Sequence, residues 1–182
     1  MRLFIGIPLE SDRQELVYQK LHPISHSLEF RLVKPENYHI TIQFLGETSI
    51  QASILGDALR IATDAISPFT FTTDKIVGFP GMQKATSIGL SVLPKDPFIT
   101  IRTQVQKILH NFGFTPGKSM IPHITVARMK HPVNISQVQN DFRLDSISQI
   151  VSEIVIYQSI LQSAGPIYHQ LVRLNLKGEL NG

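Results

Sequence analysis

Two segments of the sequence carry a histidine and a threonine separated by one apolar residue. The segment HITI begins at His39 and the segment HITV begins at His123, so Thr41 and Thr125 occupy equivalent positions. Each of these residues is followed by an apolar residue, in both segments. The chain has 7 histidines, so this double occurrence is an uncommon coincidence and indicates a shared chemical role.

These residue types suit acid–base chemistry on a phosphate ester. The unperturbed pKa of histidine is about 6.5, so near neutrality one imidazole can be neutral while another is protonated. A neutral imidazole can take a proton from a nucleophile, and a protonated one can give a proton to a leaving oxygen. The hydroxyl groups of Thr41 and Thr125 can donate hydrogen bonds to the charged oxygens of a phosphate.

Two other interpretations stay open on the residues alone. A histidine in a strand often serves only packing or a structural hydrogen bond, and His39 and His123 could instead be two ligands of a metal ion. Neither motif has a carboxylate or a second histidine at ligand spacing, and the chain has no cysteine. The spacing rules for metal sites are therefore poorly met, and we expect no metal and no cofactor.

The alternation of apolar residues predicts that both motifs lie on strands. Side chains of a strand point alternately to its two faces, so His39, Thr41 and Gln43 should share one face. The apolar residues between them, together with Phe44, should face the core. An apolar face would thus bury the strand while the other face presents an imidazole beside a hydroxyl.

The second motif repeats this pattern, with His123, Thr125 and Ala127 expected on one face. Strict alternation then places Arg128 on the buried face with Val126. Arg128 can reach the face of the histidines only if the strand ends or bulges at this point.

The rest of the sequence must supply the elements that hold these two strands. Helical spacing and end signals predict helices over 11–23, 49–66 and 96–113. Short apolar or alternating runs predict strands over 2–9, 26–33, 38–45, 68–80, 84–93, 121–129, 147–161 and 167–176, whereas 131–147 offers no clear prediction. Each motif strand lies in its own half of this order, which suggests a degenerate duplication of a helix-and-sheet unit.

Composition limits the class of protein. A length of 182 residues with 42% hydrophobic residues predicts one domain over 1–182 with a sizeable core. The net charge of +3 fits an anionic substrate, and the absence of cysteine excludes disulfides and thiolate catalysis. The sequence shows no signal peptide and no apolar run of membrane-spanning length, so we expect a cytoplasmic protein that does not bind a membrane.

The quoted segments resemble those of a known family. The two motifs are similar to those of the two-histidine phosphoesterases, and more closely to those of the LigT-like RNA 2′,3′-cyclic phosphodiesterases, once named 2′-5′ RNA ligases. The resemblance runs nearly end to end, through RLFIGIPL, VKPENYHITIQFLGE, GFTPGKSMIPHITVAR and YQSILQSAGPIYHQL. It implies a bilobed α+β fold in which two antiparallel sheets face a central cleft, with helices outside and a pseudo-twofold relation between the lobes.

The resemblance also implies a reaction and a site. The reaction opens the 2′,3′-cyclic phosphate end of an RNA or nucleotide to a 2′-phosphate without a metal. His39 would protonate the leaving 3′ oxygen, and His123 would activate water. Thr41 and Thr125 would hold the phosphate oxygens, and Arg128 matches an arginine that contacts phosphate in the family. The assignments of acid and base could be exchanged, because both motifs look alike.

This sequence departs from the family pattern around the base of the substrate. Met120 stands where the family often has an aromatic residue, Lys84 stands where it often has an arginine, and the chain has no tryptophan. Phe4, Tyr38 and Phe79 could supply an aromatic surface, although the usual place of such residues is the core or the rim.

Alternatives to the implied enzyme are a non-catalytic module that binds RNA ends or nucleotides and a related phosphoesterase with another substrate. Ligation of a cyclic end to a 5′ hydroxyl is permitted as the reverse reaction. A monomer is the default expectation for a closed two-lobed cleft.

Overall fold

The computed structural model describes residues 1–25, 30–117, 120–137, 146–163 and 165–178. The described helices are α1 (Ser11–Ser25), α2 (Ala52–Asp64) and α3 (Asp96–His110), with short 3-10 turns η1 (Pro35–Asn37) and η2 (Met82–Lys84). The strands are β1 (Arg2–Pro8), β2 (Phe30–Leu32), β3 (His39–Glu47), β4 (Phe69–Phe79), β5 (Ala85–Leu93), β6 (His123–Val133), β7 (Ser148–Val151), β8 (Glu153–Ile160) and β9 (Ile167–Asn175).

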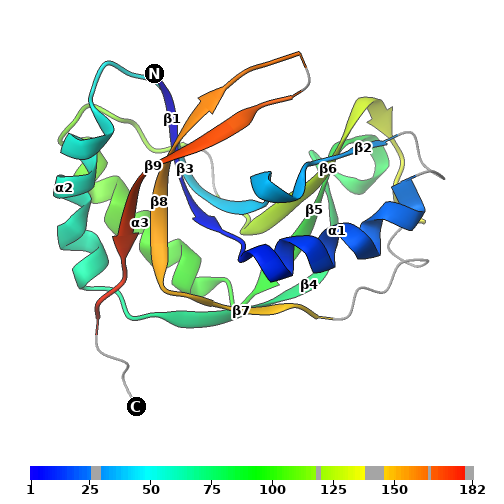
Figure 1. The fold of residues 1–182 in the computed structure, drawn as a ribbon, viewed down its shortest axis with the longest axis horizontal. Coiled ribbons are helices and arrows are strands. Elements are labelled where there is room, and N and C mark those ends of the chain that lie inside the picture. The colour runs from blue at the N-terminus through cyan, green and yellow to red at the C-terminus, as the bar shows by residue number, and fades with distance from the viewer. Residues whose placement is uncertain (26–29, 118–119, 138–145, 164, 179–182) are drawn as a thin grey trace.

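The strands form one antiparallel sheet in the order β7-β4-β5-β6-β3-β1-β8-β9, with β2 paired to β6. The two motif strands, β3 and β6, are neighbours at the centre of this order, where Ile40 pairs with Ile124. The expected α+β fold is confirmed, and so is a lobe around each motif. The expectation of two separate sheets needs correction, because this pairing joins the two halves into one strongly curled sheet (Figure 1).

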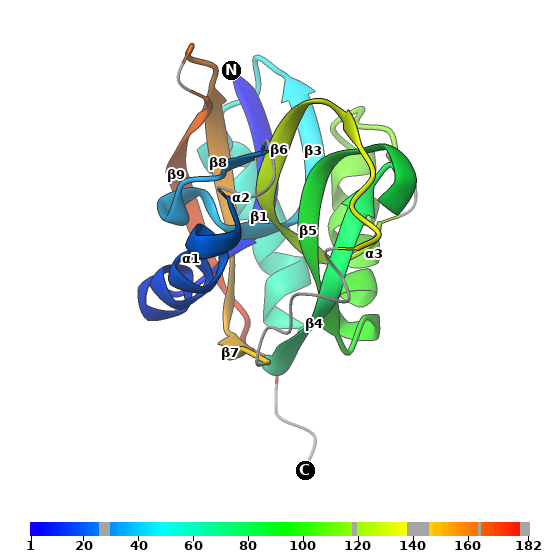
Figure 2. The same ribbon diagram turned by 90° about the vertical axis from the view of Figure 1, so that its right-hand side faces the viewer.

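The region 147–161, predicted as a single strand, is two strands that belong to opposite halves. β7 pairs with β4, whereas β8 pairs with β1 and β9, and only Ser152 separates them. A chain that passes within one residue from the edge strand β7 to β8, the second strand from the opposite edge, requires the two ends of the sheet to lie close together. The sheet therefore curls towards a half-barrel, as Figure 2 shows from the side.

The helices cover the outside of this sheet and supply its core. The side chains of α3 that face inwards recur at helical spacing, and all are buried: Phe98, Ile101, Val105 and Leu109. α2 packs on β8, β9 and α3, whereas α1 packs against β2 and η1 on the opposite side of the molecule (Figures 1 and 2). None of the described helices is both long and apolar enough to cross a membrane.

The remaining boundaries differ little from those predicted. The helix expected over 49–66 begins at Ala52, and the helix expected over 96–113 ends at His110 before Gly113 adopts a positive φ of 80°. Of the strand expected over 26–33, residues 26–29 lie outside the described part of the chain, and β2 accounts for Phe30–Leu32. β6 continues to Val133, into a region for which local patterns offer no clear prediction.

The pairing of Ile40 with Ile124 predicts where the fold is most sensitive. Ile124 is fully buried at the junction of the two halves, so Ile124→Ala should lower the free energy of unfolding by about 2–5 kcal/mol. Ile61 is 73% exposed on α2, so Ile61→Ala should change it by less than about 0.5 kcal/mol. Urea denaturation of both variants checks this, and equal losses would contradict the central role of the junction.

Candidate active site

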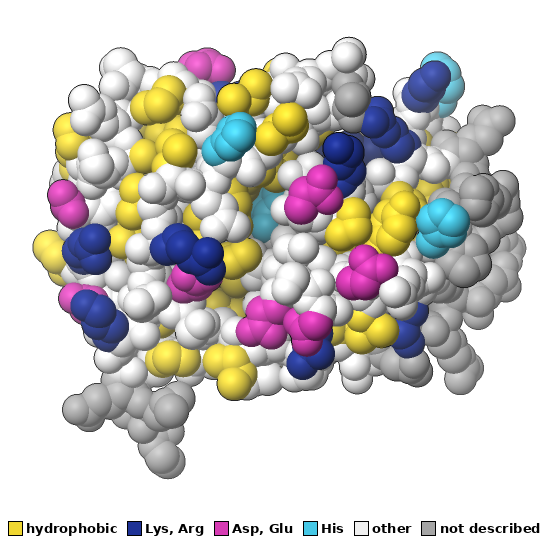
Figure 3. Space-filling view, viewed as in Figure 1, with side chains coloured by type: hydrophobic (Ala, Val, Ile, Leu, Met, Phe, Trp, Pro, Cys, Tyr) yellow, Lys and Arg dark blue, Asp and Glu magenta, His cyan; other side chains and the backbone are white. Residues whose placement is uncertain are grey.

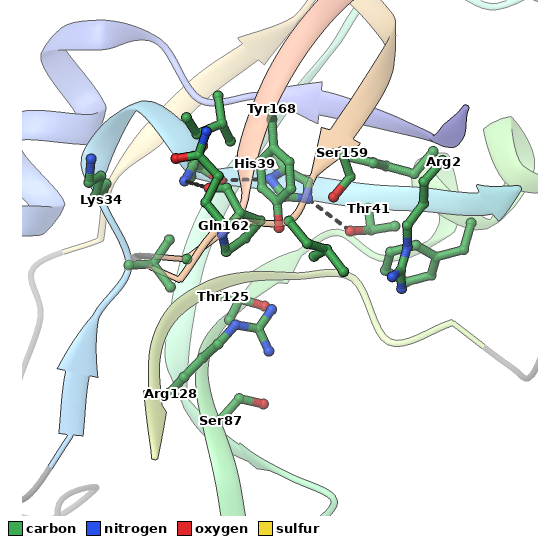
Figure 4. Close-up of a pocket in the computed structure, with 18 of the residues that line it drawn as sticks. Arg2, Lys34, His39, Thr41, Ser87, Thr125, Arg128, Ser159, Gln162 and Tyr168 are labelled. Carbon is green, nitrogen blue, oxygen red and sulfur yellow. Dashed lines mark hydrogen bonds between the residues drawn. The ribbon is translucent and has the colours of Figure 1, made fainter. Parts of the chain in front are cut away.

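A cavity of about 740 Å³ opens on the concave side of the curled sheet. The structure places all five residues singled out in the sequence around it: His39, Thr41, His123, Thr125 and Arg128. Figure 4 shows His39 and Thr41 on one side of the cavity, with Thr125 and Arg128 opposite them. The curl of the sheet brings the two motif strands, which are neighbours at its centre, to face a common space.

The two imidazoles are held in the same way. Nδ1 of His39 lies 2.7 Å from the carbonyl oxygen of Asn37, and Nδ1 of His123 lies 2.6 Å from that of Ile121. A carbonyl can only accept, so each Nδ1 carries the proton and donates it. Each Nε2 is therefore the nitrogen that is free to accept or donate a proton on the side of the cavity. His39 Nε2 lies 3.1 Å from Thr41 Oγ1.

A glycine on the neighbouring strand leaves room for each imidazole. Gly6 pairs with Thr41 and Gly89 pairs with Thr125, so the two glycines hold equivalent places beside the motifs. A Cβ on Gly6 would lie 3.2 Å from Cδ2 of His39. On Gly89 it would lie 2.8 Å from Cδ2 of the other imidazole, too close for any real contact. Both rings thus lie directly over backbone that lacks side chains.

Aromatic rings pack against the same imidazoles. The ring centre of Phe4 lies 4.9 Å from that of His39, and the ring of Tyr168 meets it edge-on at 5.2 Å. On the other side, the ring centre of Phe79 lies 4.1 Å from that of His123. Asn37 contributes a further restraint, since its side chain donates to the carbonyl of Pro166 in the connection between β8 and β9.

These surroundings depress the pKa of both histidines. Burial lowers the pKa of His39 to about 4, with further lowering by His123 and Arg128. Burial also lowers the pKa of His123 below 6.5, and Arg128 adds to the effect. The hydrogen bonds to backbone carbonyls oppose the shifts without cancelling them. Both shifts favour the neutral form of the imidazole.

A β-bulge interrupts β3 directly after its motif. Ile5 pairs with Gln43 and Gly6 pairs with Thr41, so Ile42 is an extra residue. Ile42 and Gln43 are both buried, and Phe44 turns to the cavity. The predicted strict alternation is therefore wrong after Thr41, because the extra residue reverses the faces that follow it.

An equivalent bulge interrupts β6. Ile88 pairs with Ala127 and Gly89 pairs with Thr125, so Val126 is the extra residue. Val126 and Ala127 are both buried, which corrects the expected exposure of Ala127 on the face of the histidines. Arg128 is exposed and lines the cavity. Arg128 was expected to reach the face of the histidines only if the strand ended or bulged, and this bulge fulfils that condition.

The wall of the cavity carries positive charge. The described residues that line it include four cationic side chains and no Asp or Glu: Arg2, Arg31, Lys34 and Arg128. Figure 3 shows Lys and Arg side chains over the region of β2 and η1, beside a hollow in which a histidine is visible. This arrangement favours an anionic ligand.

Several lining residues were not anticipated from the sequence, including Arg2, Phe44, Ser87 and Tyr168. The place of Phe44 in the cavity could have been inferred from the sequence, because Phe44 follows His39 by the same five positions that separate Arg128 from His123. Of the aromatic residues named from the sequence, Tyr38 and Phe4 are buried, and Phe79 is half-buried.

The described residues contain no group of three or more His, Asp or Glu side chains placed to hold a metal ion. The chemistry that this donor set offers directly is proton transfer by two imidazoles, with hydroxyl and guanidinium groups as hydrogen-bond donors.

Comparison with known proteins relates the chain to a family of phosphoesterases. The family model described as LigT like Phosphoesterase matches residues 5–89. An RNA 2′,3′-cyclic phosphodiesterase of Aeropyrum pernix is 32% identical over 158 residues, which are 81% of this chain and 88% of that protein. Another, from Archaeoglobus fulgidus, is 27% identical over 173 residues, covering 94% of this chain and 98% of that protein.

The fold has a counterpart among solved structures. The crystal structure of a protein from Thermus thermophilus, TT0787, matches with a TM-score of 0.80 and 22% identity, over 99% of this chain and 100% of that one. The relative from Aeropyrum pernix, 32% identical over most of both chains, together with the matching family model, shows that the chain belongs to the LigT-like phosphoesterase family.

Proposed function

We propose that this protein hydrolyses the 2′,3′-cyclic phosphate ends of RNA or nucleotides to 2′-phosphates, without a metal. The observation that carries the proposal is the placement of two histidines in one cavity, each with Nδ1 hydrogen-bonded to a backbone carbonyl. The names of the relatives from Aeropyrum pernix and Archaeoglobus fulgidus, RNA 2′,3′-cyclic phosphodiesterase, supply the substrate class.

The reaction needs one base and one acid on opposite sides of the phosphorus. Nε2 of neutral His123 takes a proton from water as the oxygen of the water bonds to phosphorus. The bond from phosphorus to the 3′ oxygen breaks, and Nε2–H of protonated His39 gives its proton to that oxygen. The ring opens to a 2′-phosphate, and the two imidazoles have exchanged protonation states. The same sequence, with a 5′ hydroxyl in place of water as the nucleophile, would give 2′-5′ ligation.

The other site residues stabilise the charge that accumulates on the phosphate. The hydroxyls of Thr41 and Thr125 donate to its non-bridging oxygens, and Arg128 adds a charge-assisted donor from the edge of the site. Thr41 is already within reach of His39 Nε2, so it can turn from the imidazole to a bound oxygen.

Binding of the phosphate must also prepare the acid. The pKa of His39, near 4, leaves this imidazole mostly neutral at pH 7 before a substrate binds. A phosphate anion beside it offsets the charge of Arg128 and favours the imidazolium, which raises the pKa. The negative charge of the substrate thus favours the protonated form of His39, which the reaction needs as its acid.

Hydrolysis of a nucleoside 2′,3′-cyclic phosphate in EDTA tests the proposal. His39→Ala and His123→Ala should each lower kcat by about 10²–10⁴-fold, because each removes one proton transfer. His110→Ala, at an exposed position at the end of α3 and outside the cavity, should retain wild-type activity as the matched control. Chromatography should identify the product as the 2′-phosphate.

Each alternative outcome has a distinct meaning. A 3′-phosphate product would keep the two-histidine chemistry but reverse the choice of leaving oxygen. Activity that disappears in EDTA and returns with a divalent metal would refute metal-free catalysis. No turnover by the wild-type protein would direct attention to another phosphoester or to a binding module.

The pH dependence provides a second prediction. The profile of kcat/KM reports the ionisation of the free enzyme, and both histidines have a pKa below 6.5. The bell-shaped profile should therefore have its maximum below pH 6.5. Arg128→Ala removes a charge that lowers both pKa values, so it should shift the maximum to higher pH while reducing the rate. A maximum above pH 8, or one that Arg128→Ala leaves in place, would contradict the electrostatic account.

A further inference from the structure

Asn37 makes two hydrogen bonds that join different parts of the site around His39. Its backbone carbonyl accepts the Nδ1 proton of His39 at 2.7 Å, and its side-chain amide donates to the carbonyl of Pro166 at 3.0 Å. Pro166 lies in the connection between β8 and β9, 129 residues further along the chain. One residue therefore links the imidazole to a segment that is distant in the sequence.

The backbone on both sides of Asn37 is hydrogen-bonded, which fixes the direction of its carbonyl. In the turn η1, the amide of Asn37 donates to the carbonyl of Lys34 at 2.9 Å, and the amide of Tyr38 donates to that of Pro35 at 2.9 Å. The carbonyl of Tyr38 in turn accepts from the amide of Leu9 at 3.1 Å. A turn held in this way can keep both a ring and a neighbouring segment in fixed positions.

The connection that Asn37 contacts belongs to a hairpin that projects beyond the neighbouring strand. β8 pairs with β1 from Val155 to Gln158, whereas it pairs with β9 as far as the pair of Ile160 and Ile167. Several residues of this projecting end line the cavity, including Pro166. The hydrogen bond from η1 thus holds part of the cavity wall against the rest of the site.

The same end of the hairpin packs directly on His39. The ring of Tyr168 meets the imidazole edge-on, with 5.2 Å between the ring centres, and Figure 4 shows the two side chains next to each other. The position of this hairpin end therefore determines how closely the ring of His39 is packed and how much water reaches it.

We propose that Asn37 is a positioning residue of the reaction, whose side-chain amide holds the β8–β9 connection against η1 and thereby keeps the imidazole of His39 aligned for proton transfer. The inference rests on the proposed function, because it assigns a role in the step that His39 performs. Asn37 acts through His39 and transfers no proton itself, since a side-chain amide does not titrate near neutrality.

Hydrolysis of a nucleoside 2′,3′-cyclic phosphate by two uncharged variants tests this role. Asn37→Leu keeps a similar size but has no donor. It should lower kcat by about 10–100-fold, since a displacement of about 1 Å at a catalytic group can cost about 10²-fold. KM should change little, because the proposed phosphate contacts come from Thr41, Thr125 and Arg128. Asn37→Gln, which keeps the amide donor, should lose less, and equal losses in the two variants would overturn the inference.

An NMR titration of His39 in the same variants gives a readout that a general structural role would not move. Burial is the main cause of the low pKa of His39, so a hairpin end that moves away should admit water and raise that pKa towards 6.5. Asn37→Leu changes none of the titratable or charged groups that face the imidazole, which are His123, Arg128, Tyr157 and Tyr168. A wild-type pKa of His39 in folded Asn37→Leu would overturn the inference.

Arg173→Ala is the matched control within the same hairpin. Arg173 of β9 donates to Glu153 of β8 at 2.9 Å, at the end of the hairpin away from the cavity. This variant should keep the wild-type kcat and the wild-type pKa of His39. A loss of kcat equal to that of Asn37→Leu would attribute the effect to any weakening of the hairpin and would overturn the inference.

The two readouts separate the inference from the proposed function. If the wild type hydrolyses the substrate and Asn37→Leu keeps its kcat, the inference fails while the proposed function stands. If the wild type shows no turnover, the proposed function fails, whereas a raised pKa of His39 in Asn37→Leu would still support the hold of Asn37 on the imidazole.

Discussion

The hydrogen bond from each motif histidine to the carbonyl two residues earlier is the interaction on which the site depends. It assigns the proton to Nδ1 in both rings and leaves both Nε2 atoms available to accept or donate a proton. The glycines on the neighbouring strands let the rings lie close over the sheet, and Phe4 and Phe79 pack against them. Two identical anchors in one cavity give two chemically equivalent nitrogens, which the protein then makes unequal through burial and charge.

Because the single sheet is curled, the two imidazoles that these hydrogen bonds hold face the same cavity. β3 and β6 pair at Ile40 and Ile124. The strands on either side of them contribute residues to the walls of the cavity. Matching bulges then turn Phe44 and Arg128 to the same space. The two halves thus present the motif residues in equivalent places, and they differ at the position after each bulge, where one carries Phe44 and the other Arg128.

Much of this arrangement could be predicted from the sequence, for identifiable reasons. Period-two alternation up to Thr41 and Thr125 correctly oriented the motif residues, and helical periodicity located α1, α2 and α3. The faces of Gln43, Phe44 and Ala127 were wrong, because a bulge depends on pairing with a distant strand and leaves no sign in local alternation. The merging of two sheets into one was missed for the same reason, since a single inter-strand pair decides it.

The most direct test of the central claim is ¹⁵N NMR of the imidazoles with and without a nucleoside 2′-phosphate. The account predicts that both histidines are neutral Nδ1–H tautomers at pH 7 in the free protein, and that the ligand raises the pKa of at least one of them. Assignment of the protonated ring would then identify the acid. Nε2–H tautomers, or pKa values that the bound phosphate leaves unchanged, would contradict the account.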